Sequence, residues 1–142
     1  MRYLASLLIL VVVGCSPPPS DPNALTDEQK RLYQHSHNSM EIAEGLEVSH
    51  FAHEPMLVNP TNIDVDHKGR IWVCEGYNYR LRLNPDKSGK PEGDRILILE
   101  DTDFDGKADK QTVFYQGNDV NSALGISVLG DKIIVSKSPS II

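Results

Sequence analysis

The chain has 142 residues, of which 24% are charged and 39% are hydrophobic, and its formal net charge at pH 7 is −6. Twenty acidic residues outnumber the 14 lysines and arginines, and the basic residues form no stripe along the sequence. Binding to nucleic acid is therefore not expected.

The first 14 residues have the pattern of an export signal. Arg2 provides a short positive start, and an apolar run follows from Leu4 to Val13. This run is too short to span a bilayer, which takes about 20 residues, but it has the length of the apolar core of a signal peptide. One interpretation is an ordinary secretory signal that is followed by a cysteine by chance.

The apolar run ends in Val12-Val13-Gly14-Cys15, which resembles the lipobox of bacterial lipoproteins. In that motif the cysteine is lipidated and becomes the new N-terminus. We therefore predict a lipoprotein signal peptide over residues 1–14 and lipidation at Cys15. The protein is expected to be exported and anchored to a membrane of the cell envelope, in the periplasm or at the outer membrane.

Residues 15–41 predict a tether followed by one short helix. The proline-rich stretch from Ser16 to Pro22 favours extended polyproline II. Thr26 and Gln29 have the spacing of a capping box, which predicts a helix that continues to about Gln34. Two histidines follow at 35 and 37, but no third ligand is near in the sequence, so we interpret them as solvated residues.

Residues 42–142 have the pattern of an all-β domain. Short runs of alternating or β-branched residues, separated by turn residues, predict strands. These runs are 46–51, 62–65, 70–73, 95–99, 111–115, 124–128 and 132–135.

Two of the predicted hairpins form an internal repeat. Ile63 and Val65 match Ile126 and Val128, and residues 71–73 match residues 133–135, with one residue fewer in the second turn. A repeated four-stranded antiparallel unit is typical of a β-propeller blade. We expect about one and a half blades and, because propellers close with four to eight, a fragment of a longer protein. The alternative is a chance similarity between two hairpins.

The turn between the predicted strands 95–99 and 111–115 carries candidate metal ligands. Carboxylates stand at positions 1, 3, 5 and 9 of a calcium-type loop over residues 101–109, with Gly106 at position 6 and the Lys107 carbonyl at position 7. These carboxylates belong to Asp101, Asp103, Asp105 and Asp109. They would repel one another without a cation.

We predict a structural calcium ion in a β-hairpin loop rather than in a helix–loop–helix. An EF-hand would place glutamate at position 12, where this chain has Thr112. The alternative is an acidic, solvated turn that holds no ion.

No catalytic residue is assigned. Cys74 stands in an apolar strand, and no histidine or asparagine partner can be assigned to it, which predicts a buried, inert thiol. His53 and His67 are interpreted as loop or surface residues. Tyr79 and Arg80 are interpreted either as part of a propeller face or as a cross-strand packing pair.

Several short motifs occur together in residues 42–142. They are Glu44-Gly45-Leu46-Glu47-Val48, Phe51-Ala52-His53-Glu54-Pro55, Asn59-Pro60, Gly69-Arg70-Ile71-Trp72-Val73-Cys74-Glu75, Tyr77-Asn78-Tyr79-Arg80, Gly93-Asp94-Arg95-Ile96 and the loop 100–109. Together they resemble the N-terminal propeller of the membrane-bound dehydrogenases, which are large exported bacterial proteins. That propeller is related to the soluble quinoprotein glucose and sorbosone dehydrogenases.

The resemblance implies two alternative functions. The first is the N-terminal part of a dehydrogenase that oxidises a carbohydrate or another small molecule. Many members of that family carry a cytochrome c domain, but this sequence has no Cys-x-x-Cys-His motif and no match to the quinoprotein active-site histidine segment. Haem c or a quinone is therefore expected only C-terminal to this sequence, and the chain alone is expected to be inactive.

The second function is a calcium-stabilised propeller that binds carbohydrate or protein without redox activity.

Overall fold

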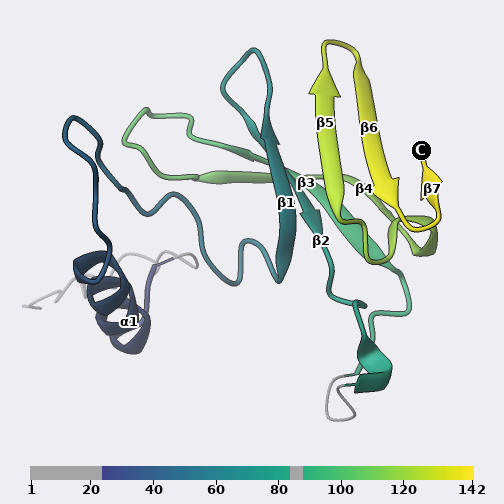
Figure 1. The fold of residues 1–142 in the computed structure, drawn as a ribbon, viewed down its shortest axis with the longest axis horizontal. Coiled ribbons are helices and arrows are strands. Elements are labelled where there is room, and N and C mark those ends of the chain that lie inside the picture. The colour runs from purple at the N-terminus through teal and green to yellow at the C-terminus, as the bar shows by residue number, and fades with distance from the viewer. Residues whose placement is uncertain (1–23, 84–87) are drawn as a thin grey trace, which may run out of the picture.

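The computed structural model describes residues 24–83 and 88–142, which contain one α-helix and seven strands in two antiparallel sheets (Figure 1). The prediction of an all-β domain is confirmed. The predicted signal peptide, Cys15 and the proline-rich stretch lie outside the described residues, so their predictions stay predictions.

Helix α1 (Asp27–Asn38) begins with the predicted capping box. The Gln29 N–H donates to Thr26 Oγ1 at 3.2 Å, and the Thr26 N–H donates to Gln29 Oε1 at 2.8 Å. The helix ends later than predicted, because no glycine or proline interrupts the sequence before Gly45. It lies at the end of the molecule away from the second sheet (Figure 1).

The predicted strand over residues 46–51 is wrong. This segment has no regular secondary structure, and Leu46 is exposed. Its alternating pattern has a different cause, because the chain crosses the face of a sheet instead of pairing with an edge. Phe51 and Met56 pack there against Leu97 and Leu99.

Sheet A has the strand order β1-β2-β3-β4, so each strand pairs with the next one in sequence. Its strands are β1 (Pro60–Val65), β2 (Ile71–Glu75), β3 (Asp94–Glu100) and β4 (Lys110–Gly117). The two central strands carry most of the buried side chains, as their runs of β-branched and aliphatic residues predict.

Sheet B has the order β5-β6-β7, with β5 (Gly125–Leu129), β6 (Lys132–Lys137) and the short β7 (Ser140–Ile141). Its first hairpin repeats the first hairpin of sheet A in register. Ile63 pairs with Val73 and Val65 with Ile71, and in the same way Ile126 pairs with Val135 and Val128 with Ile133. The sequence repeat is therefore a repeat of structure.

The main core lies between the two sheets. Trp72, Cys74, Ile96 and Ile98 of sheet A pack against Ile126 and Val135 of sheet B, together with Val120 and Ala123 of the connection. A second cluster fills the opposite face of sheet A, where segment 51–57 covers it.

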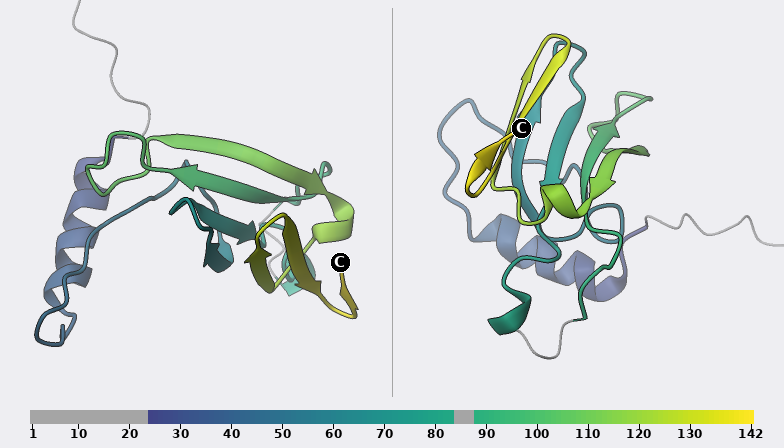
Figure 2. Two further views of the ribbon diagram at one scale, coloured as in Figure 1. Left: turned by 90° about the horizontal axis from the view of Figure 1, so that it is seen from above. Right: turned by 90° about the vertical axis from the view of Figure 1, so that its right-hand side faces the viewer.

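Strands β1 and β5 lie side by side and run in the same direction, as the right-hand view of Figure 2 shows. Asn62 Oδ1 accepts from the Ile126 N–H at 2.9 Å, and Asp64 Oδ2 accepts from the Val128 N–H at 2.7 Å. The Asp64 carboxylate accepts from the Val128 N–H and also from the Val65 N–H, and these two hydrogen bonds lower its pKa. The first strands of the two sheets are therefore joined through side chains.

Candidate metal centre

The predicted calcium-type loop connects β3 to β4 and is closed at its base. The Asp109 N–H donates to the Glu100 carbonyl at 3.0 Å, and Lys110 Nζ pairs with Glu100 Oε2 at 2.7 Å. Two residues of the loop, Phe104 and Gly106, have positive φ angles of 62° and 86°. Glycine adopts this conformation without steric cost, which is why the sequence needs it at position 6.

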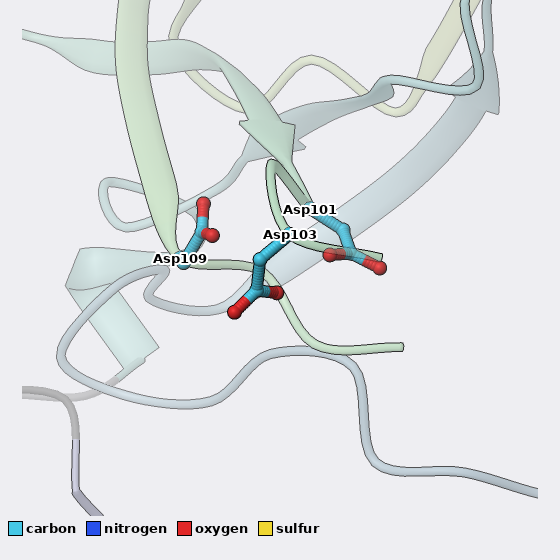
Figure 3. Close-up of side chains that lie close together, drawn as sticks. All are labelled: Asp101, Asp103 and Asp109. Atoms are coloured by element: carbon cyan, nitrogen blue, oxygen red, sulfur yellow. The ribbon is translucent and has the colours of Figure 1, made fainter. Parts of the chain in front are cut away.

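The loop brings three of the four predicted carboxylates together. Asp101, Asp103 and Asp109 each offer one oxygen, and these oxygens lie within 4.8 Å of one another (Figure 3). Asp105 is outside this group. Its Oδ1 accepts from the Lys107 N–H at 2.8 Å, and its Oδ2 lies 3.6 Å from Lys107 Nζ.

Backbone N–H groups orient these carboxylates. Asp101 accepts from the N–H of Gly106 at 2.9 Å and from that of Asp105 at 3.2 Å. The Asp105 N–H also lies 3.3 Å from Asp103 Oδ1. An ionised carboxylate has about four lone-pair sites, so these bonds leave acceptor capacity for a cation.

Thr102 is a member of the site that sequence reasoning missed. Its hydroxyl donates to Asp109 Oδ2 at 2.7 Å, and its N–H lies 3.2 Å from both oxygens of the same carboxylate. Thr102 therefore fixes the last aspartate of the loop across the base of the turn. The only signal in the sequence is a threonine directly after position 1, which is too weak to assign.

Segment 50–56 forms a wall beside the loop. The Ala108 N–H donates to the Phe51 carbonyl at 2.8 Å, and a cavity of about 450 Å³ lies between these two segments and residues 24–30 at the start of α1. His50 and His53 line this cavity with stacked rings whose centroids are 5.1 Å apart. Burial lowers the pKa of His50, and the neighbouring His53 and Lys107 lower it further.

Three buried carboxylates away from the loop have structural partners. Asp66 accepts from Trp72 Nε1 at 3.0 Å and from Arg70 Nε at 2.6 Å, and Glu75 forms a two-pronged pair with Arg95 at 2.6 and 2.7 Å. Burial by itself would raise the pKa of Asp66, but its hydrogen bonds hold the pKa well below the ordinary value.

The third buried carboxylate is Asp94, which joins the two sheets. It accepts from the N–H of Asn78 and from that of Ser122, each at 2.8 Å. The side chain of Asn121 bonds to both the Asp94 N–H and the Asn78 amide. The motifs around residues 78 and 94 therefore serve the joint between the sheets.

The structure also places the cysteine, the histidines and the Tyr79–Arg80 pair that the sequence singled out. Cys74 is fully buried, and burial raises its pKa to about 11, so the thiol is inert as predicted. His67 is exposed in the β1–β2 turn, whereas His53 is partly buried in the cavity wall. Tyr79 and Arg80 are consecutive residues of a turn, so they do not form a cross-strand pair, although the Arg80 guanidinium lies 4.9 Å from the centre of the Tyr79 ring.

Comparison with known proteins gives one match. A family model described as "Domain of unknown function (DUF7133)" matches residues 33–142, which is more than half of the chain, so the chain belongs to this family. No curated protein and no solved structure matches the chain. Among the described residues, no helix is long and apolar enough to cross a membrane.

Proposed function

We propose that this member of the DUF7133 family is a calcium-stabilised β-propeller module of an exported lipoprotein. One calcium ion in loop 101–109 would hold the β3–β4 hairpin and segment 50–56 in place. The observation that carries the proposal is the convergence of oxygens from Asp101, Asp103 and Asp109 within 4.8 Å.

The chemistry of the loop favours calcium over other cations. Ca²⁺ takes six to eight oxygen ligands at 2.3–2.6 Å in flexible geometry, whereas Mg²⁺ demands a tighter octahedron and gives up its waters reluctantly. The three converging side chains offer only oxygen, and the Lys107 carbonyl, Asp105 and water are available to complete the shell. Without a cation the carboxylates repel one another, so binding removes an unfavourable interaction.

Three observations support the propeller. Sheet A is a meander of four consecutive strands, sheet B begins with a hairpin in the same register, and the first strands of both sheets lie side by side. Stacked four-stranded meanders around a common axis are the architecture of propellers.

The test is calorimetric titration of the chain with CaCl₂, together with thermal unfolding in Ca²⁺ and in chelator. Extracellular calcium modules bind with Kd values of roughly 10⁻⁴ to 10⁻³ M. At a hundredfold excess over Kd, bound ligand stabilises the folded state by about 2.7 kcal/mol. We expect a rise in Tm with Ca²⁺ and little change with equimolar Mg²⁺.

The matched variants are Asp103→Ala and Asp131→Ala. Asp103 belongs to the converging group, whereas Asp131 is exposed in the β5–β6 turn. Only Asp103→Ala should abolish the heat of binding and the shift in Tm. Coincident unfolding curves of the wild type in Ca²⁺ and in chelator would show that the loop is an acidic turn without an ion.

The role of the longer protein rests on the resemblance. A propeller of the dehydrogenase type would oxidise a carbohydrate or another small molecule with haem c or a quinone held elsewhere, because the residues of this chain do not fit either group. The alternative is a binding module, and the cavity beside the loop supports it. Coding sequence downstream decides between them, since a Cys-x-x-Cys-His motif there supports the redox function.

A further inference from the structure

The tip of loop 101–109 carries the most exposed large apolar side chain among the described residues. Phe104 is 91% exposed, and its φ angle of 62° lies in the left-handed region. A bulky residue rarely adopts this conformation, and strained residues of this kind cluster at functional sites. Phe104 also belongs to neither core cluster, so the fold itself does not account for an aromatic side chain at this position.

The predicted membrane anchor enters the fold beside this loop. Ala24 and Leu25 line the same cavity as Asp103 and Lys107, and the left-hand view of Figure 2 shows the β3–β4 loop next to α1. Cys15, which lies outside the described residues, precedes Ala24 by nine residues. A chain extends by at most about 3.6 Å per residue, so a lipid-modified Cys15 would hold Ala24 within about 32 Å of the membrane.

We infer that loop 101–109 docks on the phospholipid surface to which the chain is anchored, with the Phe104 ring inserted among the lipids. The inference rests on the proposed function, because it needs the lipid at Cys15 and a calcium ion in the loop. A short tether gives the loop a high effective concentration at the surface, so a contact that is weak by itself becomes populated.

Calcium makes the loop compatible with an anionic surface. The loop contains four aspartates and one lysine, so its formal charge is −3, and one Ca²⁺ changes it to −1. The three converging carboxylates and the Lys107 carbonyl provide four of the six to eight oxygens that Ca²⁺ takes, which leaves positions for phosphate oxygens of lipids. The side chains of Lys30 and Lys107 line the cavity beside the loop and are largely exposed, so they are available to further phosphates.

The test measures whether residue 104 enters the bilayer. The chain is purified as the cell processes it, with its lipid, and is reconstituted in vesicles of phosphatidylethanolamine and phosphatidylglycerol. Phe104→Trp places an indole at the tip of the loop, and the single native tryptophan, Trp72, is buried and gives the baseline. Lipids brominated on their acyl chains quench an indole that enters the bilayer. We expect loss of most of the added fluorescence in Ca²⁺ and its recovery in chelator.

The matched control is Leu129→Trp, which places an indole at an exposed position of sheet B, away from α1, in a chain with the same anchor. Its fluorescence should not change with brominated lipids or with Ca²⁺. Asp103→Ala combined with Phe104→Trp should remove the effect of Ca²⁺ on quenching. Far-UV circular dichroism verifies that all variants keep their β content.

Calorimetric titration with CaCl₂ in the absence of vesicles and fatty-acid labelling report on the proposed function separately. If the chain binds calcium and is labelled, but Phe104→Trp is not quenched, the docking is overturned and the proposed function stands. Equal quenching of Phe104→Trp and Leu129→Trp overturns the docking as well, because the chain then has no preferred face towards the lipids. Quenching of Phe104→Trp that persists in chelator overturns the calcium-dependent contact. Absence of both calcium binding and quenching overturns the inference together with the proposed function.

Discussion

Asn62 Oδ1 accepts a hydrogen bond from the N–H of Ile126 at 2.9 Å, and this bond joins the first strand of sheet A to the first strand of sheet B. Without such bonds, the edge of β5 would expose backbone N–H groups that could pair with another strand. Because side-chain oxygens of β1 accept from these N–H groups, β1 and β5 do not form a backbone ladder with each other. The two sheets instead stack through their faces, with Trp72 in the core between them.

This arrangement predicts that Asn62→Ala destabilises the chain by about 1 kcal/mol, the net value of a typical hydrogen bond. Asn62→Asp keeps an acceptor oxygen at the same position and should therefore lose less stability than Asn62→Ala. Urea unfolding followed by tryptophan fluorescence measures both, because Trp72 lies in the affected core. Equal losses for the two variants would mean that the acceptor oxygen is not what matters.

The Asp66 carboxylate predicts a loss of stability in acid. Its pKa is lower in the folded chain than the value of about 3.9 expected for an unfolded aspartate. Below about pH 4 the unfolded state therefore binds more protons than the folded state, and the free energy of unfolding falls as the pH falls. The contribution of Asp66 is complete above the unfolded pKa and is lost as the pH approaches the folded pKa.

Asp66→Asn isolates this contribution. Asparagine has the same shape, but its amide group opposes the donors Trp72 Nε1 and Arg70 Nε. The variant should be clearly less stable than the wild type at pH 7, and the difference should shrink between pH 5 and pH 3. Urea unfolding at these pH values measures the difference in stability. A difference that does not change with pH would contradict the lowered pKa of Asp66.

The strands of both sheets could be predicted because β-branched residues alternate there between turn residues. Prediction failed for segments whose structure depends on contacts with residues far away in the sequence. Segment 46–51 alternates like a strand, yet Phe51 packs onto the face of sheet A. The two-residue strand β7 follows Ser138-Pro139 and is too short for any periodic signal.

At the candidate site, spacing predicted the right loop but not the complete arrangement. Which carboxylates converge depends on the backbone at Phe104 and Gly106, and this turn leaves Asp105 outside the group. Glycine at position 6 can be predicted from spacing, but a left-handed phenylalanine cannot. The contact from Ala108 to Phe51 joins residues far apart in the sequence, which no local pattern records.

The ion pair between the buried Glu75 and the partly buried Arg95 predicts a strong and asymmetric mutational response. Glu75 also accepts from the Val58 N–H at 2.7 Å, so its carboxylate has three donors. Arg95→Met removes two of them and leaves the charge buried, which costs about 3–5 kcal/mol. Adding Glu75→Gln should recover part of this loss, because the uncompensated charge is gone. Chemical unfolding measures both, and additive losses would contradict the pairing.

Lipidation at Cys15 predicts a difference in fatty-acid labelling. The apolar run that ends at Gly14-Cys15 motivates it, and Cys15 lies outside the described residues. Metabolic labelling with a fatty-acid analogue should label the wild type and leave Cys15→Ser unlabelled and unprocessed. Cys74→Ser is the matched control, because its thiol is buried and should not affect labelling. Equal labelling of the wild type and Cys15→Ser would exclude Cys15 as the modified residue.

The calcium loop predicts unequal roles for aspartates that spacing alone would treat alike. Asp101, Asp103 and Asp109 have converging oxygens, whereas Asp105 is paired with Lys107. Asp103→Asn should therefore weaken calcium binding by more than about tenfold, which corresponds to about 1.4 kcal/mol, and Asp105→Asn should weaken it less. Both variants remove one negative charge from the same loop. The difference between their calcium affinities therefore reports direct ligation by the carboxylate rather than the overall electrostatic attraction of the loop. Calorimetric titration of the two variants under identical conditions measures it. If Asp105→Asn weakened binding as much as Asp103→Asn, then the bound loop would use position 5 as a ligand, and its turn would have to rearrange around the ion.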